Sequence, residues 1–405
     1  MTAINPRRLL TNAGLLSLAL IYVLLWINMI NDPKQRTGSD FIGFYSFGRI
    51  AQTRGFENIY NVKAQENIEE GVVGFQVNPE FYTHVPFIAA LADLLVDSNY
   101  IHSFIRWAIV LLFLNVASSY LLIQALRKGN FGKEETFILF AGIFLFFPAF
   151  SAFMNGQDDA ILLLGLAFWL WGMLSEKPFL AGLGLSLTTV RPQTALFLAI
   201  PFLFKQRKVL WGFALGGMIL VIISWALIKT EGMINFINSL KVIESTIWIE
   251  PHTLDMPTIS GMIRRNFKVI DVTLLRNLIW GCYLAGIIGF CIAWHRSKEI
   301  LEKHIGLLAL FSILLVPYAH YHDLVILLVP IVCLIRVLSS RKIIVTGLLS
   351  ILPLIVSLIA LVGFAGPGYL KFPLIYFVML ILGYLLLFPD RIQWMTKPQK
   401  GETNV

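Results

Sequence analysis

The chain of 405 residues is strongly apolar and carries few charges. Hydrophobic residues make up 57% and charged residues 14% of the sequence, whereas soluble domains are about half apolar and a quarter charged. With a mean hydropathy of +0.75, this composition excludes an ordinary soluble protein and predicts an all-α protein that crosses a membrane many times. The net charge of +8 does not predict nucleic-acid binding, because the basic residues lie in short clusters between apolar runs.

Apolar segments alternate with polar connections along the whole chain. The first, Leu9 to Ile30, is long enough to span a membrane and lacks a small-residue cleavage site, so we expect a retained helix and no signal peptide. The pattern predicts one domain, residues 1–405, with about twelve transmembrane helices. Their expected ranges are 9–30, 101–126, 134–150, 158–174, 178–190, 194–204, 208–228, 273–294, 305–317, 322–338, 342–362 and 373–389.

The basic connections predict how the helices are oriented. By the positive-inside rule the Lys/Arg-rich turns lie in the cytoplasm together with both termini. Two long connections, 31–100 and 229–271, then become outer loops. The segment Phe81–Val96 is apolar, but a full crossing there would invert all the turns that follow, so we expect an interfacial or half-inserted helix. The basic turns are Arg127 to Lys133, Glu176-Lys177, Lys205 to Lys208, His295 to Lys303, Arg341-Lys342 and the tail from Arg391.

Polar residues collect in the predicted outer connections, beginning with Asp40. Aromatic residues from Phe41 to Phe47, Tyr45 among them, recur at near-helical spacing and predict a helix lying on the membrane surface. Asp40 either caps this helix or serves as a general base at the lipid–water boundary.

Two further clusters flank the middle spans. Asn155 and Gln157 offer amide groups suited to sugar hydroxyls, whereas the adjacent Asp158 and Asp159 are typical caps of the helix that follows. Arg191 interrupts an apolar stretch, and a cation in that position predicts either phosphate binding or contact with the outer headgroups.

The last cluster contains His320, His322 and Asp323 in an outer turn. Its spacing matches no strong zinc motif, and the three cysteines all lie in apolar segments. We therefore expect no metal, although Asp158 and Asp159 leave a divalent ion open. Weaker candidates are His84, before Pro86, and Arg265 in the second outer loop, which binds either a phosphate or anionic headgroups.

In their order and spacing these clusters resemble the polyprenyl-phosphate-sugar-dependent enzymes of glycosyltransferase family 87, membrane enzymes of the GT-C class that include bacterial mannosyltransferases. The resemblance is good over the first half of the chain and loose over the second. Arg191 stands where the family usually has Lys, and only one proline remains near Pro86. The matching stretches are Asp40-Phe41 with Tyr45, Tyr82 to Phe87, Asn155-Gly156-Gln157, Ala181-Gly182-Leu183, Arg191-Pro192-Gln193, Lys205 to Trp211 and His322-Asp323-Leu324.

The resemblance implies a GT-C-type bundle with interfacial helices in the first outer loop, in the plasma (inner) membrane of a bacterium. It implies inverting transfer of a hexose, most often mannose, from a polyprenyl-phosphate donor to a glycolipid or glycan acceptor outside the cytoplasm, without a cofactor. Asp40 would be the base. Arg191, His322 and Arg265 would bind the donor phosphate. The expected sugar or acceptor contacts are Asn155, Gln157, Tyr45, His84, His320 and Asp323.

Two other functions fit the same composition. A transporter or flippase of a lipid-linked or anionic solute would show repeats and ionisable residues near the midplane. No repeat stands out here, and most polar clusters lie at one face. A noncatalytic scaffold would tolerate the loss of Asp40, Arg191 and His322 together.

Overall fold

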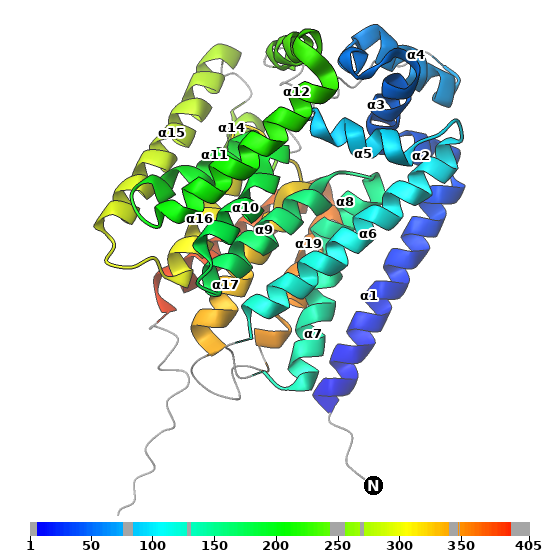
Figure 1. The fold of residues 1–405 in the computed structure, drawn as a ribbon. Coiled ribbons are helices and arrows are strands. Elements are labelled where there is room, and N and C mark those ends of the chain that lie inside the picture. The colour runs from blue at the N-terminus through cyan, green and yellow to red at the C-terminus, as the bar shows by residue number, and fades with distance from the viewer. Residues whose placement is uncertain are drawn as a thin grey trace, which may run out of the picture.

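The computed structural model describes residues 6–75, 84–127, 131–243, 256–267, 271–339, 347 and 349–389. Every regular element among these residues is a helix, so the all-α prediction is confirmed (Figure 1). The helices are α1 (Pro6–Asn31), α2 (Pro33–Thr37), α3 (Phe41–Arg54), η1 (Phe56–Asn58), α4 (Val62–Val73), α5 (Phe87–Leu95), α6 (Tyr100–Ala125), α7 (Lys133–Phe144), α8 (Phe147–Asn155), α9 (Asp159–Leu174), α10 (Pro178–Ser186), η2 (Leu187–Val190), α11 (Pro192–Ala199), η3 (Ile200–Leu203), α12 (Arg207–Ile243), α14 (Ile259–Asn266), α15 (Val272–Arg296), α16 (Glu302–Leu315), η4 (His322–Leu327), α17 (Leu328–Ser339), α19 (Leu352–Ala365) and α20 (Gly368–Leu387).

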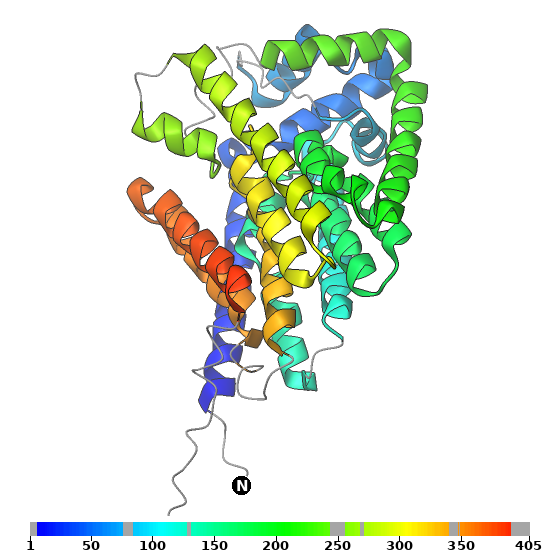
Figure 2. The same ribbon diagram turned by 90° about the vertical axis from the view of Figure 1, so that its left-hand side faces the viewer.

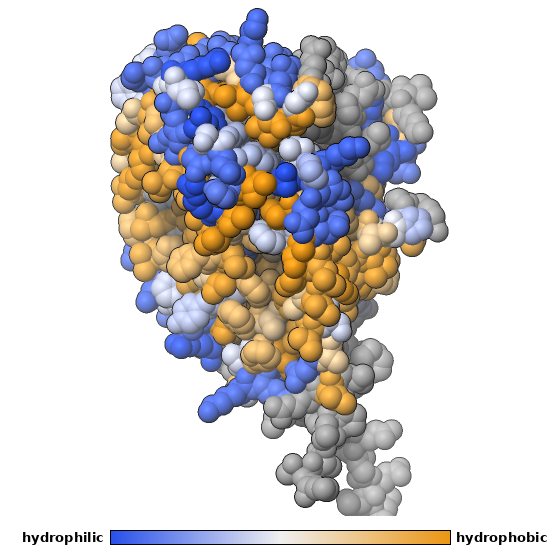
Figure 3. All heavy atoms as spheres, turned by 90° about the vertical axis from the view of Figure 1, so that its right-hand side faces the viewer, coloured by the Kyte–Doolittle hydropathy of each residue, from blue (hydrophilic) through white to orange (hydrophobic). Residues whose placement is uncertain are grey.

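Six of these helical stretches are long and apolar enough to cross a membrane, or seven if α7 and α8, bent by 41°, form one broken span. Four more apolar stretches are shorter: α9, α10 with η2, α11 with η3, and α19. The helices lie where spans were predicted, but a count of about twelve crossings is not confirmed. Figure 3 shows apolar side chains around the middle of one face and hydrophilic ones above and below them, as a membrane protein requires.

The helix α5 lies in the ambiguous segment before α6. With nine residues it is much shorter than the roughly 20 residues that a membrane crossing needs. It lies across the ends of the long helices (Figure 1) and packs closely on α3, where a Cβ on Gly48 would stand 2.7 Å from the carbonyl oxygen of Ala92. This arrangement agrees with the interfacial helix expected there, although residues 81–83 lie outside the described part.

The second long connection begins with a sharp change of direction in α12. Lys229 has a left-handed φ of 57° and divides this element in two. The first part runs with the bundle, whereas the second lies across its end (Figure 2), where it contacts η1. A salt bridge of 3.5 Å from Lys229 Nζ to Glu57 Oε1 joins the two long connections.

One end of the bundle is therefore covered by α2 to α5, the second part of α12 and α14 (Figures 1 and 2). Directly beneath α3, aromatic side chains fill the core. Phe41 stacks on Phe104 with ring centroids 4.7 Å apart, and Phe44 stacks on Trp107 at 4.9 Å. This packing fixes the first turn of α3, and hence Asp40, against α6.

Candidate functional site

Arg191 stands at the centre of a buried group of charges. It follows η2 and precedes Pro192, which disfavours a helical conformation at Arg191 and begins α11. At this break the guanidinium binds three aspartates: Nε to Asp323 Oδ1 at 2.8 Å, Nη1 to Asp158 Oδ1 at 2.9 Å and Nη2 to Asp159 Oδ2 at 3.3 Å. Only 12% of the Arg191 side chain is exposed, and the three carboxylates are at most 3% exposed.

The two adjacent aspartates come from the turn between α8 and α9. Asp158 occupies the N-cap position of α9, but its side chain makes no capping hydrogen bond. Capping alone therefore does not account for this carboxylate. The turn depends on Gly156, which has a φ of 72° and whose Cβ, if present, would stand 2.7 Å from Cβ of Phe41. Trp107 Nε1 donates to the Gly156 carbonyl at 2.7 Å. This hydrogen bond holds the turn close to Phe41, the residue that follows Asp40.

Two histidines flank the aspartates. Nδ1 of His84, just before α5, lies 3.0 Å from Asp158 Oδ2. Nε2 of His322, the first residue of η4, lies 3.8 Å from Asp159 Oδ2 and 3.9 Å from Asp323 Oδ2. We refer to His84, Asp158, Asp159, Arg191, His322 and Asp323 as the carboxylate cluster. It joins segments from the start, middle and end of the chain.

His320 supports the cluster from the turn before η4. Its backbone N–H donates to Asp323 Oδ2 at 2.6 Å, and its Nε2 lies 2.7 Å from the hydroxyl oxygen of Tyr318. The His320 and His322 rings are 5.4 Å apart. This turn therefore contributes the His322 imidazole and the His320 backbone N–H to the same carboxylates.

Asp40 lies at the edge of the cluster. It is the N-cap residue of α3, yet its side chain makes no capping hydrogen bond. It is half-buried and close enough to His322 for their charges to interact. Of the two explanations for Asp40 that the sequence left open, capping is not supported.

Other predicted site residues lie apart from these contacts. Tyr45 is buried in the aromatic core, donates its hydroxyl to the Ser98 carbonyl at 3.4 Å, and has its pKa raised by that burial. Arg265, on α14, donates to the Met256 carbonyl at 2.9 Å and lies 3.6 Å above the Phe372 ring. These two residues therefore do not join the carboxylate cluster directly.

The two amide residues lie in the turn that carries the aspartates. Asn155 is half-buried at the end of α8. Gln157 is 8% exposed, and its Oε1 has no hydrogen-bond partner within the described ranges. Their roles in sugar binding stay predictions.

The sequence did not reveal that Asp158 and Asp159 belong to the site, because each was explained as a helix cap. One signal was present. Two consecutive carboxylates precede an apolar helix for which a single cap would suffice, and Arg191 offers the cation that could neutralise them.

A family model described as Glycosyltransferase family 87 matches residues 82–317, more than half of the chain. The protein belongs to glycosyltransferase family 87. The matched range contains His84, Asp158, Asp159, Arg191 and Arg265, whereas Asp40 and the turn with His322 lie outside it. Comparison with curated proteins and with solved structures gave no match. Family membership makes this chain a membrane glycosyltransferase with a sugar donor and an acceptor, and favours transfer over transport.

Proposed function

We propose that this family 87 glycosyltransferase transfers a hexose, with mannose as the first candidate, from a polyprenyl-phosphate donor to a glycolipid or glycan acceptor. The reaction takes place on the extracytoplasmic side of the inner membrane of a bacterium. One observation carries the proposal. The Asp40 carboxylate makes no capping bond and is close enough to His322, a member of the buried carboxylate cluster, for their charges to interact.

In the proposed reaction Asp40 removes the proton of the acceptor hydroxyl while that oxygen attacks the anomeric carbon. The bond from this carbon to the phosphate oxygen breaks, its electron pair stays on the polyprenyl phosphate, and the proton ends on Asp40. A single displacement of this kind inverts the anomeric centre. Such a base accelerates transfer by typically 10²- to 10⁴-fold.

The leaving phosphate needs hydrogen-bond donors or positive charge. His322, whose charge interacts with that of Asp40, is the first candidate. Arg191 already binds three carboxylates, so it would reach a phosphate only by exchanging one of them. Its main contribution is to hold the cluster together, which modifies the role we expected for it.

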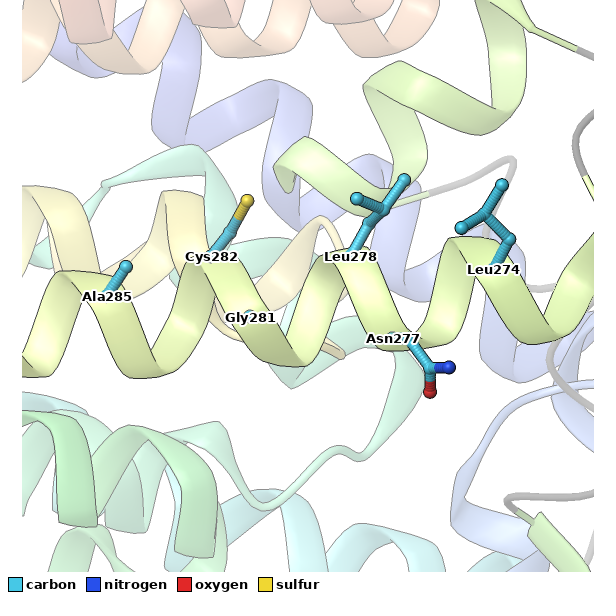
Figure 4. Close-up of a pocket in the computed structure, with 6 residues that line it drawn as sticks. All are labelled: Leu274, Asn277, Leu278, Gly281, Cys282 and Ala285. Atoms are coloured by element: carbon cyan, nitrogen blue, oxygen red, sulfur yellow. The ribbon is translucent and has the colours of Figure 1, made fainter.

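Arg265 offers a second phosphate contact, next to an apolar surface of α15 that an apolar tail could cover. We call this shallow, open surface the groove; its lining residues, Leu274 to Ala285, all belong to α15. Figure 4 shows Leu274, Leu278 and Cys282 projecting from the same face of this helix. Because α14, which carries Arg265, packs on α15, a polyprenyl chain in the groove would place its phosphate near this arginine. Binding energy from the tail then positions the reacting carbon.

The sugar and the acceptor would meet the polar groups around the Asn155–Asp159 turn. Gln157, with its unpaired amide oxygen inside the described part of the chain, is the first candidate for a sugar hydroxyl. Asn155, His84, His320 and Asp323 are further candidates. Tyr45, on α3, contributes to the buried aromatic core on which this helix packs.

Replacing Asp40 by Asn tests the base directly. We expect Asp40→Asn to lower kcat by at least 10²-fold, because an amide cannot accept the proton. The purified enzyme is given polyprenyl-phosphate mannose as donor and a membrane lipid extract as acceptor. Mass spectrometry then measures how much mannosylated product forms.

Asp32→Asn is the matched control. Asp32 caps α2 by accepting from the backbone N–H groups of Lys34 and Gln35, and Asn caps equally well. This variant should keep its activity. Undiminished transfer by Asp40→Asn would remove Asp40 from the role of base, and solute flux without any covalent product would favour the transporter alternative.

A further inference from the structure

The carboxylate cluster holds more negative than positive charge. Asp158, Asp159 and Asp323 face one guanidinium, that of Arg191. With neutral histidines, three negative charges and one positive charge leave an excess of two negative charges in a site whose charged side chains are at most 12% exposed. Buried charges without compensation are strongly destabilising, so either a bound cation or protons taken up by the cluster would stabilise it.

We propose that Asp159, His322 and Asp323 bind one divalent cation. Their ligand atoms all lie within 4.8 Å of one another. Two ligands at about 2.0–2.2 Å from a shared ion can be at most about 4.4 Å apart. The separations of 3.8 Å and 3.9 Å from His322 Nε2 to the two carboxylates fit this limit, so only a small inward movement of the remaining atoms is needed.

A second observation supports a ligand at this place. Asp159 is fully buried, and although its Oδ2 binds Arg191, its Oδ1 accepts no hydrogen bond from any residue that the structure describes. A buried carboxylate oxygen without a partner is costly. The oxygen that lies 3.8 Å from His322 Nε2 is Oδ2, so a cation held by both oxygens of Asp159 would also satisfy Oδ1 and cancel the excess charge.

The neighbours of the proposed site orient its ligands. Arg191 binds Asp159 and Asp323 through one oxygen of each, and the His320 backbone N–H fixes the other oxygen of Asp323. Such contacts are typical of the residues that surround metal ligands. Arg191 would therefore set the angle at which both carboxylates face His322.

The donor set indicates which ion would bind. Two carboxylates and one imidazole, without a thiolate in the cluster, suit Mn²⁺ better than the softer metals, because carboxylates favour Mg²⁺ and Mn²⁺ and an imidazole favours transition metals. The ion would also cancel the excess negative charge near Asp40, where the proposed function requires an anionic donor to bind. Metal binding itself does not depend on that function.

The test measures Mn²⁺ binding without donor or acceptor. The full-length protein is purified, treated with EDTA, desalted and titrated with MnCl₂, and free Mn²⁺ is followed by electron paramagnetic resonance. We expect about one ion per chain, and an affinity at least tenfold weaker in Asp159→Asn and in His322→Gln. Glu299→Gln, which changes an exposed carboxylate between α15 and α16, should bind as the unmodified protein does.

Two outcomes would overturn the proposal. One is that the unmodified protein shows no saturable binding, in which case protons neutralise the cluster. The other is that binding persists in both Asp159→Asn and His322→Gln. If Asp159→Asn does not fold, His322→Gln decides alone, because it removes a ligand without exposing a new charge. Loss of transfer in Asp40→Asn with intact Mn²⁺ binding would keep the two proposals distinguishable.

Discussion

Arg191 binds its partners in a way that a lysine could not reproduce. Its Nε, Nη1 and Nη2 each bind a different aspartate, and Nη1 also donates to the Val190 carbonyl at 3.3 Å. A guanidinium has five donors in a planar fork, whereas an ammonium is a compact point charge with three. The geometry of three carboxylates around one side chain therefore accounts for an arginine at this break.

Removing this cation should destabilise the whole fold. We expect Arg191→Met to lower the free energy of unfolding by about 3–5 kcal/mol, because three buried carboxylates lose their partner. Arg191→Lys should keep the charge but lose part of the hydrogen bonding. Its stability should therefore lie between those of Arg191→Met and the unmodified protein. Thermal unfolding of the purified variants in detergent measures the effect.

Arg296→Met serves as the control, since Arg296 is exposed at the end of α15. Its thermal stability should match that of the unmodified protein. Equal stability of Arg191→Met and the unmodified protein would mean that the aspartates carry no charge in the folded state.

The sequence identifies individual candidate site residues but not the residues that they contact. Asp40, Arg191 and His322 stand out because polar residues interrupt apolar segments. The bond from Arg191 to Asp158 spans 33 residues and that to Asp323 spans 132. Such pairings depend on how the helices pack, whereas capping is a local property that can be predicted from neighbouring residues. For this reason the sequence suggested capping for Asp158 and Asp159, whereas the structure shows both bound to Arg191.

Helix α12 crosses α10 at very short range. A Cβ on Gly212 of α12 would collide with the Phe179 carbonyl oxygen, and one on Gly182 of α10 would collide with that of Val209. Small residues at such crossings allow the backbones of membrane helices to approach each other closely. Because α10 leads directly into η2 and Arg191, this crossing also determines where the guanidinium stands.

Adding one methyl group should separate the two helices. We expect Gly212→Ala to lower the melting temperature of the purified protein, because the Phe179 backbone cannot give way as a flexible side chain can. Gly217→Ala is a matched control in the same helix, since nothing lies within 4 Å of its Cβ position. Alanine is a better helix former than glycine by about 1 kcal/mol, so this control should be neutral or more stable. A lower melting temperature for Gly217→Ala than for Gly212→Ala would contradict the close approach of α12 and α10.

Helix positions follow well from the sequence where the signals are local. The predicted span 178–190 coincides with α10 and η2, which lie between Pro178 and Pro192. The predicted span that ends at residue 228 stops just before the kink at Lys229. The break between α7 and α8 was missed, although Pro148 follows it closely, because both sides of the break are equally apolar. That α12 continues as a helix beyond the kink was missed as well, since its tertiary contacts with η1 stabilise it.

The whole molecule is polarised along the bundle axis. The surface helices α2 to α5 lie at one end, and the connection between η3 and α12 lies toward the other (Figures 1 and 2). The carboxylate cluster belongs to the first end, because His84 lies just before α5 and binds Asp158. Lys205 Nζ donates to the Lys298 carbonyl at 3.0 Å, joining two connections that we predict to be cytoplasmic. This arrangement agrees with the proposed topology.

Labelling of single cysteines tests that topology. In a Cys282→Ser background, the exposed positions Ser98, between α5 and α6, and Glu299, between α15 and α16, are each changed to Cys. We expect a membrane-impermeant maleimide to label Ser98→Cys in intact cells and Glu299→Cys only after lysis. The reverse pattern would place the candidate site in the cytoplasm.

The bond between Arg191 and Asp323 has a consequence for biogenesis. Helices enter the membrane in the order of synthesis, so Asp158, Asp159 and Arg191 are present well before Asp323 emerges from the ribosome. Until η4 arrives, the arginine lacks the partner of its Nε, and the loop carrying the two histidines of the 318–323 turn is missing. The early helices therefore form an incomplete bundle, and the late step that packs η4 against α8 and α9 creates the site before α19 and α20 are added.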